Sequence, residues 1–512
     1  MDPVVISDSD FHKLVSKRAQ SLLGLADFVA RCDQTQKVLV RPLLGDLHSQ
    51  AMQIEELLDA YDARNNCRWC SFRSVVAATK LFSDACYELL HIKHALPAYR
   101  LLAIDEGDFG LATNHILEYT GQVVRASAEN MLVLADYLAL PTLKLQNTEI
   151  YNEHLLPGRL VRNCKTKRVD AVSEMVTSLA TNFLNLAAES QEIRDVAKIK
   201  SGDYPDHLRR VVREENLRSH ELRFHNLQSQ YDTYVAGTQA EKDDPDLLVL
   251  RGHISVVFHL FKTATMFAHY HERHGSKKAC VLAAIQKPLF DVDELLTMLM
   301  SFCTSYINQF IVGAERLCRN MLQTYSTVGK VEVPIPQYRG FHVRPSTLVS
   351  KLVLHYGCSV TMKLGDESYD AQMSLELFRA NEKINAEKRR WLANEIVRLK
   401  LISGTASDSF EQVVRKVVLA LAASGKLIMY EQPLQFPEES AAKEGNILDR
   451  VISEVNRFLA VGKIDIESSV RVVFIGDLRV LEDIRLLAEV GYGEDKFGNN
   501  IPLPRQLQYL RR

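Results

Sequence analysis

The sequence predicts a protein of several domains that is mostly α-helical, with an α+β open-faced sandwich and a small α/β segment following the helical part. The chain has 512 residues, more than a single hydrophobic core usually organises. Apolar residues recur at spacings of three and four over most of residues 1–330, whereas short alternating segments begin near residue 331. Hydrophobic residues make up 46% and charged residues 25%, as in soluble globular proteins.

Residues 1–330 are expected to form one or two helical bundles. In residues 169–186, one face of a helix is apolar: Val169, Val172, Val176, Leu179, Phe183 and Leu186. The uncharged stretch Leu295–Ala314 is long enough to span a bilayer. Its middle contains serine, threonine, asparagine and glutamine, which hydrocarbon disfavours, so we expect a buried helix and no membrane insertion.

Residues 331–436 are predicted to alternate in the order strand, helix, strand, strand, helix, strand, helix, which is an α+β sandwich. The expected strands cover 331–335, 359–365, 367–371 and 396–404, and the expected helices cover 344–357, 374–381 and 407–425. The charged segment Lys383–Glu395 looks like an insert between the second helix and the fourth strand. Residues 437–512 are expected to form a separate α/β segment, with one strand between two helices.

The stretch RGFHVRPSTL, Arg339–Leu348, places a histidine just before a predicted helix. The first N–H groups of a helix are unpaired, and the helix dipole favours an anion there. His342 would therefore lie beside a phosphate cradle, with the planar Arg344 guanidinium close by. A neutral imidazole can accept a phosphoryl group and release it again. The candidate phosphate-binding residues are Gly340, Pro345, Ser346 and Thr347.

This stretch resembles the active-site motif of HPr, the histidine-containing phosphocarrier of the bacterial phosphotransferase system. Phe341 replaces the family's aliphatic residue and Val343 its small residue, and the resemblance covers residues 331–425. It implies that His342 receives a phosphoryl group from an enzyme I-like donor protein and passes it to an acceptor or regulatory protein, with no cofactor. Fusion to a long helical region favours regulation over bulk sugar transport.

Two features leave the assignment open. Ser374 lies one place after the position of a regulatory serine in some HPr proteins, so it is either a regulatory phosphosite or a helix N-cap. The branched Val343 and the insert Lys383–Glu395 are also compatible with a non-catalytic interaction scaffold that has kept the fold and lost phosphotransfer. In that case His342 would be dispensable.

Other functions have weaker support. The net charge of −2 gives no global sign of nucleic-acid binding, and the basic segment His207–His225 also contains glutamates that can form ion pairs along a helix. The pair Cys67 and Cys70 lacks a second pair for zinc. A metal enzyme would need carboxylates near His271 and His274. The N-terminal sequence MDPVVISDSD does not have the layout of a signal peptide, so we expect a cytoplasmic protein; the oligomeric state is open.

Overall fold

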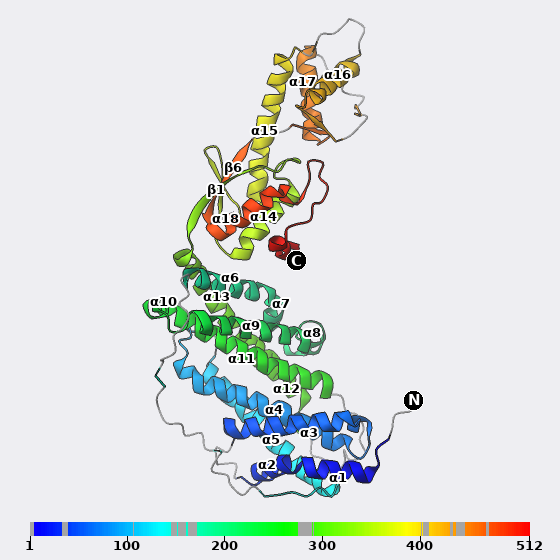
Figure 1. Ribbon diagram of the computed structural model, residues 1–512, viewed down its shortest axis with the longest axis vertical. Helices are drawn as coiled ribbons and strands as arrows, with labels where there is room; N and C mark the ends of the chain where they lie inside the picture. Colours follow the sequence, from blue (N-terminus) through cyan, green and yellow to red (C-terminus); the bar gives the residue numbers. More distant parts are fainter. Residues whose placement is uncertain are drawn as a thin grey trace. The chain divides into compact units, whose positions relative to one another are not determined.

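The protein is described by a computed structural model that covers residues 5–32, 39–105, 107–144, 151, 160–161, 172–274, 289, 291–400, 402, 409–430, 434–436, 446–466 and 470–511. The chain divides into two compact units, Met1–Asn320 (unit 1) and Met321–Arg512 (unit 2). The described residues are mostly helical, and the strands belong to a small antiparallel sheet and a two-stranded ribbon in unit 2 (Figure 1).

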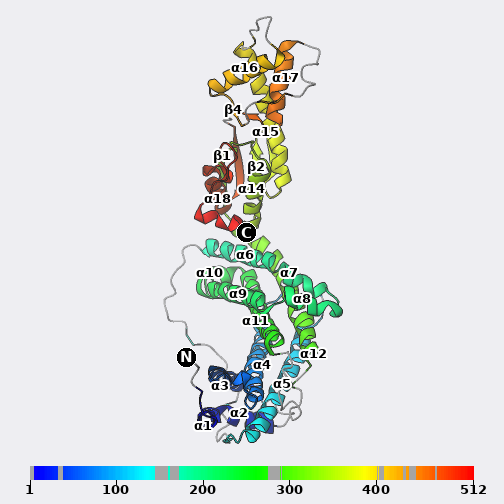
Figure 2. The same cartoon turned by 90° about the vertical axis from the view of Figure 1, so that its right-hand side faces the viewer.

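The N-terminal region is built from packed helices, as the apolar spacing predicts. They are α1 (Asp8–Arg18), α2 (Gln20–Arg31), α3 (Arg41–Ala60), α4 (Cys70–Ala95), α5 (Phe109–Tyr137), α6 (Val172–Glu189), α7 (Gln191–Asp195), α8 (Tyr204–Arg210), α9 (Glu214–Tyr234), α10 (Gln239–Asp243), α11 (Pro245–His274), α12 (Val292–Met298) and α13 (Ser305–Tyr325). Within unit 1, α4 contacts α3, α5 and α11, and α11 also contacts α9 (Figures 1 and 2). The predicted apolar face of α6 is buried at Val176, Leu179, Phe183 and Leu186.

The uncharged stretch Leu295–Ala314 is helical, as expected. It includes most of α12, a π-helical turn at Leu299–Thr304 and the first half of α13. Two helical stretches, Pro245–His274 and Val292–Tyr325, are long and apolar enough to cross a membrane, with 72% and 67% of their most apolar windows buried in the fold. Core helices of soluble proteins pass the same test, so this is weak evidence for a membrane protein.

Unit 2 contains a four-stranded antiparallel sheet. Its strands are β1 (Val328–Pro334), β2 (Thr361–Leu364), β3 (Glu367–Asp370) and β6 (Arg471–Asp477), in the order β1-β6-β2-β3. β6 pairs with both β1 and β2, so that Phe474 lies opposite Val331 on one side and Met362 on the other. Helices α14 (Val343–Tyr356), α15 (Ser374–Arg398) and α18 (Leu478–Glu489) accompany the sheet, and α14 contacts the other two.

The fourth strand expected over 396–404 is wrong, because α15 continues through the supposed insert Lys383–Glu395 and ends at Arg398. No proline or glycine interrupts this run, and alanine, leucine, glutamate, lysine and arginine favour helix. Residues at helical spacing along it are buried: Leu377, Ala380, Ile384, Lys388, Leu392 and Ile396. The expectation that residues 437–512 form a separate segment is wrong, because β6 and α18 belong to the four-stranded sheet and its helices. We call β1, α14, β2, β3, α15, β6 and α18 the sheet-bearing part.

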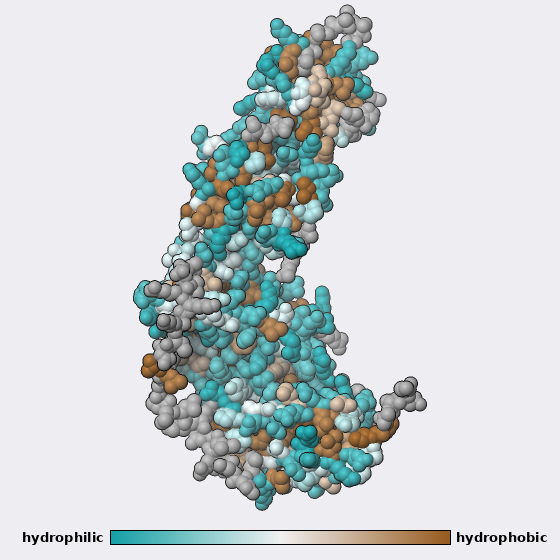
Figure 3. All heavy atoms as spheres, viewed as in Figure 1, coloured by the Kyte–Doolittle hydropathy of each residue, from teal (hydrophilic) through white to brown (hydrophobic). Residues whose placement is uncertain are grey.

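The described residues of 399–470, between α15 and β6, form a second part of unit 2 that we call the inserted lobe. Its elements are α16 (Phe410–Ala423), β4 (Ile428–Met429), α17 (Ile447–Ala460) and β5 (Ile464–Asp465). They pack on the C-terminal half of α15 around a core of their own, which includes Leu392, Val417 and Phe458 (Figure 1). On the face of unit 2 drawn in Figure 3, hydrophobic and hydrophilic side chains are interspersed.

Candidate functional site

His342 lies at the start of α14, where the sequence predicts it. It is the N-cap residue of the helix, and its carbonyl accepts the first helical hydrogen bond from Ser346 N–H at 3.1 Å. Arg339 and Gly340, three and two residues before His342, both have left-handed backbone angles, with φ of 55° and 63°. A Cβ on Gly340 would lie 2.2 Å from Asn381 Oδ1, so a side chain at this position would have to displace the Asn381 amide. The predicted tight turn at Gly340 is therefore present, and its positive φ favours glycine.

A carboxylate that the sequence analysis missed completes the site. Glu494 Oε2 lies 2.7 Å from His342 Nε2, and Glu494 Oε1 lies 3.2 Å from Arg344 Nη1. The Glu494 side chain is 6% exposed, while those of His342 and Arg344 are 23% and 41% exposed. Because a carboxylate only accepts hydrogen bonds, Nε2 carries the proton, and Nδ1 of a neutral ring keeps its lone pair. Tyr338 packs edge-on against the imidazole, with the ring centres 5.4 Å apart.

Glu494 is held in place by the turn Gly491–Gly493, which follows α18. The Glu494 N–H donates to Gly491 O at 3.2 Å, and the buried Tyr492 hydroxyl donates to Pro334 O at 2.8 Å. The carboxylate is thus fixed to the end of β1, although 152 residues separate it from His342 in the chain. A contact between such distant residues leaves no local signal in a single sequence.

The remaining motif residues shape the helix start. Ser346 is fully buried and its hydroxyl donates to Phe341 O at 2.8 Å, while the Thr347 hydroxyl donates to Val343 O at 2.7 Å. In this structure both hydroxyls are engaged with backbone carbonyls instead of facing an anion. Pro345 lies in the first turn, where proline loses no hydrogen bond. The N–H groups of that turn have no acceptor within the helix and remain the natural donors to an anion.

Ser374 lies at the beginning of α15, but the N-cap position belongs to Met373. Reading Ser374 as the helix N-cap is therefore wrong by one residue. The side chain is half-buried, and its role as a regulatory phosphosite stays a prediction.

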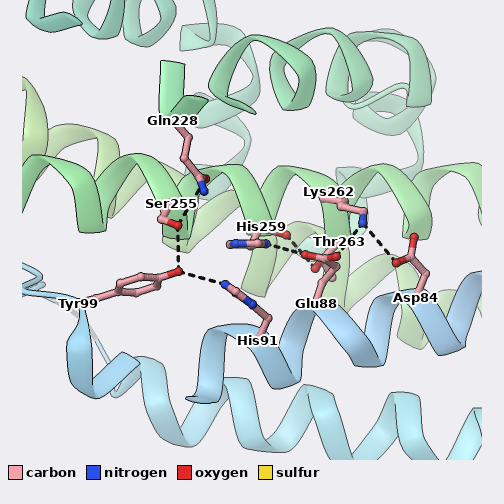
Figure 4. Close-up of polar contacts among 9 residues, drawn as sticks. All are labelled: Asp84, Glu88, His91, Tyr99, Gln228, Ser255, His259, Lys262 and Thr263. Carbon is pink, nitrogen blue, oxygen red and sulfur yellow. Dashed lines mark hydrogen bonds and ion pairs between the residues drawn. The ribbon is translucent and has the colours of Figure 1, made fainter. Parts of the chain in front are cut away.

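Unit 1 contains a separate buried polar cluster, which the sequence analysis did not single out (Figure 4). Glu88 on α4 accepts a hydrogen bond from His259 Nδ1 on α11 at 2.5 Å and another from Lys262 at 2.7 Å. The His91 ring lies against the His259 ring, with centroids 4.2 Å apart. Tyr99 OH lies 3.5 Å from His91 Nε2. These contacts join α4 to α11 through groups that must be paired when they are buried.

Burial and charge set the ionisation of this cluster. Burial by itself raises the pKa of Glu88, but hydrogen bonds and charges from His259 and Lys262 outweigh it and hold that pKa at about 2. Burial, together with the charge on His259, lowers the pKa of His91 to about 4. The cluster therefore favours an ionised Glu88 beside a neutral His91. Its interior position is consistent with a role in fixing the two helices.

No metal site emerges from the described parts of the chain. Within them, no group of three or more histidine, cysteine, aspartate and glutamate side chains is placed to hold an ion. The histidines of α11 have other partners: His253 contacts Phe310 O and Leu102 N, and His269 pairs with Glu214. Burial lowers the pKa of His274 to about 3, together with nearby positive charges.

No protein-family model matches the chain, and no curated protein or solved structure shows a significant match to it.

Proposed function

We propose that unit 2 carries an HPr-like phosphocarrier domain, in which His342 accepts a phosphoryl group and passes it to a protein partner or signals its presence. The observation that supports this best is the pairing of His342 Nε2 with Glu494 at 2.7 Å. That hydrogen bond orients the ring and fixes the proton on Nε2, which leaves Nδ1 as the nucleophile at the start of a helix.

The chemistry needs only these groups and a phosphohistidine donor such as an enzyme I-like protein. As Nδ1 of His342 attacks phosphorus, the N–P bond of the donor breaks and the donor imidazole leaves with the electron pair of that bond. The positive charge that develops on the His342 ring is stabilised by Glu494. Arg344 is 41% exposed and presents further guanidinium N–H groups to the phosphoryl oxygens.

The order of elements in unit 2 supports the proposal. β1, α14, β2, β3, α15, β6 and α18 follow the order strand, helix, strand, strand, helix, strand, helix that the resemblance implies, with the inserted lobe between the fifth and sixth. His342 is accessible to a partner protein, and the neighbouring Val343 is 65% exposed. The proposed setting is the cytoplasm, with unit 1 docking a partner or reading the phosphorylation state.

Intact mass measurement tests the proposal. The full chain is incubated with phosphoenolpyruvate and the enzyme I-like protein of the same organism. We expect an acid-labile gain of one phosphoryl group in the wild type and in His355→Ala, a control histidine on α14. His342→Ala should show no gain. Absence of the gain in the wild type, or its persistence in His342→Ala, would contradict the proposal.

A second candidate is a non-catalytic interaction scaffold. It is favoured by the fact that Glu494 already pairs with both His342 and Arg344, so that the Arg344 charge is partly neutralised before a phosphoryl group arrives. In that case phosphorylation fails with the donor, and His342→Ala leaves partner binding unchanged.

A further inference from the structure

We propose that Asp465, in the inserted lobe, is a positioning residue for His342, because it holds the backbone of Arg339 in the left-handed conformation that presents the histidine. This inference rests on the proposed function of His342. It assigns a role to the inserted lobe, which lies outside the motif and is joined to the sheet-bearing part by α15 and β6.

The backbone before His342 is in a conformation that needs support. Arg339 has φ of 55° and is followed by Gly340 at 63°. Glycine adopts this region freely, whereas a residue with a Cβ is disfavoured there by contact with its own backbone. A left-handed arginine therefore persists only where surrounding contacts hold it.

Three contacts hold Arg339, and two of them come from the inserted lobe. The Arg339 N–H donates to Asp465 Oδ2 at 3.1 Å, and the Arg339 carbonyl accepts from Asn381 Nδ2 on α15 at 3.1 Å. The Arg339 guanidinium packs on Gly462, where a Cβ would lie 2.5 Å from Arg339 Cζ. Gly462 follows the C-terminal end of α17, where the helix dipole favours a cation.

Asp465 is itself fixed by a buried ion pair. Its Oδ1 lies 2.7 Å from Lys388 Nζ on α15 and accepts the Ile466 N–H at 2.7 Å. The two charged side chains are only 3% and 2% exposed. Such a pair adds little net stability compared with apolar side chains, but breaking it on one side is costly. The ion pair with Lys388 therefore fixes the position of the Asp465 carboxylate that accepts the Arg339 N–H.

This arrangement makes the inserted lobe part of the phosphoacceptor site. When the lobe moves away from α15, Arg339 loses its amide acceptor and the packing of its guanidinium. The backbone then relaxes toward conformations with negative φ, which rotates His342 away from Glu494. The acceptor nitrogen is then no longer held in a fixed direction.

Amide hydrogen exchange on the wild-type chain tests this without a substitution. Within the inserted lobe, the Tyr430 N–H donates to Lys463 O at 2.9 Å, and this amide is the reference for the internal stability of the lobe. We expect the Arg339 amide to exchange far more slowly than an unbonded surface amide, because its acceptor is the buried carboxylate of Asp465. An Arg339 amide that exchanges as fast as an unbonded surface amide would overturn the proposal.

A paired substitution gives the second test. Lys388→Met with Asp465→Ala removes both buried charges together and leaves Arg339 without its acceptor. The control is Lys426→Met, which removes an ion pair with Glu395 that does not touch Arg339. We expect at least tenfold faster exchange at Arg339 in the double variant. We also expect a change in the ¹⁵N shifts of the His342 ring, which report its tautomer, and no such change in the control.

Unchanged His342 shifts and Arg339 exchange in a folded double variant would overturn the proposal. If that variant does not fold, the wild-type exchange measurement decides. Both readouts are independent of phosphorylation. A chain with a protected Arg339 amide that accepts no phosphoryl group therefore refutes the proposed function alone, and a phosphorylated chain with an unprotected amide refutes the positioning role alone.

Discussion

The carboxylate of Glu494 accepts a hydrogen bond from His342 Nε2 at 2.7 Å. This contact joins the turn after α18 to the first residue before α14, and the other carboxylate oxygen pairs with Arg344. A partly exposed histidine is thereby given one ring orientation and one tautomer, as carboxylates do for imidazoles in many functional sites.

Replacing Glu494 with glutamine should lower the rate of His342 phosphorylation about ten- to a hundredfold. The amide can still accept a hydrogen bond from Nε2, but it no longer stabilises the positive charge on the ring. The rate is measured by intact mass over time with the enzyme I-like donor. Glu482→Gln is the control, since Glu482 is exposed on α18 and pairs only with Arg485 among the described ion pairs. Equal rates in the two variants would contradict the role of Glu494.

Arg344 should contribute through the geometry of its donors as well as its charge. Arg344→Lys keeps the charge and loses the planar fork, so we expect a several-fold slower phosphoryl transfer. Arg344→Met loses both and should be slower by about tenfold or more. Arg379→Lys, an exposed position on α15, should leave the rate unchanged. A wild-type rate in Arg344→Met would show that the guanidinium does not contact the phosphoryl group.

Gly340→Ala should destabilise unit 2 more than Gly365→Ala does. Both glycines have φ near +60°, so each alanine costs about 1–2 kcal/mol of conformational strain. Only at Gly340 does the new Cβ collide with Asn381 Oδ1, which adds about 1–3 kcal/mol, whereas the space at Gly365 is open.

Urea unfolding can report unit 2 by itself because the chain has two tryptophans. In a Trp69→Phe background, fluorescence comes from Trp391 on α15. Comparable losses in the free energy of unfolding for the two glycine variants would show that the contact with Asn381 is easily relieved.

Unit 1 should lose stability as the pH falls from 7 to 5. Burial, and to a smaller extent the charge on His259, lowers the pKa of His91 to about 4, whereas the pKa of a histidine in the unfolded chain is about 6.5. Between these values the unfolded chain binds more protons, so the stabilising effect of a neutral His91 is present above pH 6.5 and is lost toward pH 4. Glu88, with a pKa of about 2, adds a loss only below about pH 4.5.

The measurement is the urea midpoint in a Trp391→Phe background, where the buried Trp69 reports unit 1. We expect His91→Gln to flatten the change between pH 7 and pH 5. His115→Gln, at an exposed position, should follow the wild type. A wild-type pH dependence in His91→Gln would refute this account of the cluster.

Local patterns predicted the elements around the motif but not their partners. Helix α14 with its stop at Gly357, the strands β2 and β3, and the extended segment of β6 all follow from apolar spacing and turn residues. The position of β6 in the sheet could not be predicted, because the inserted lobe separates β6 from its partner strands along the chain. For the same reason the contact between His342 and Glu494 could not be read from the sequence.

The length of α15 was misjudged for a different reason. The charged composition of Lys383–Glu395 favours an insert, whereas Lys388 in its middle is buried against Asp465. Without knowledge of that partner, a lysine at a helical core position is indistinguishable from one on an exposed face.

The most direct test of the central claim is to identify the phosphorylated atom. The ¹⁵N-labelled chain is treated with the enzyme I-like donor, and two-bond ¹H–¹⁵N spectra of the histidine rings are recorded at mildly alkaline pH. The account predicts one phosphorylated ring, that of His342, with the phosphoryl group on Nδ1 and the proton on Nε2 facing Glu494. A phosphoryl group on Nε2, or a His342 ring unchanged by its own donor, would contradict it.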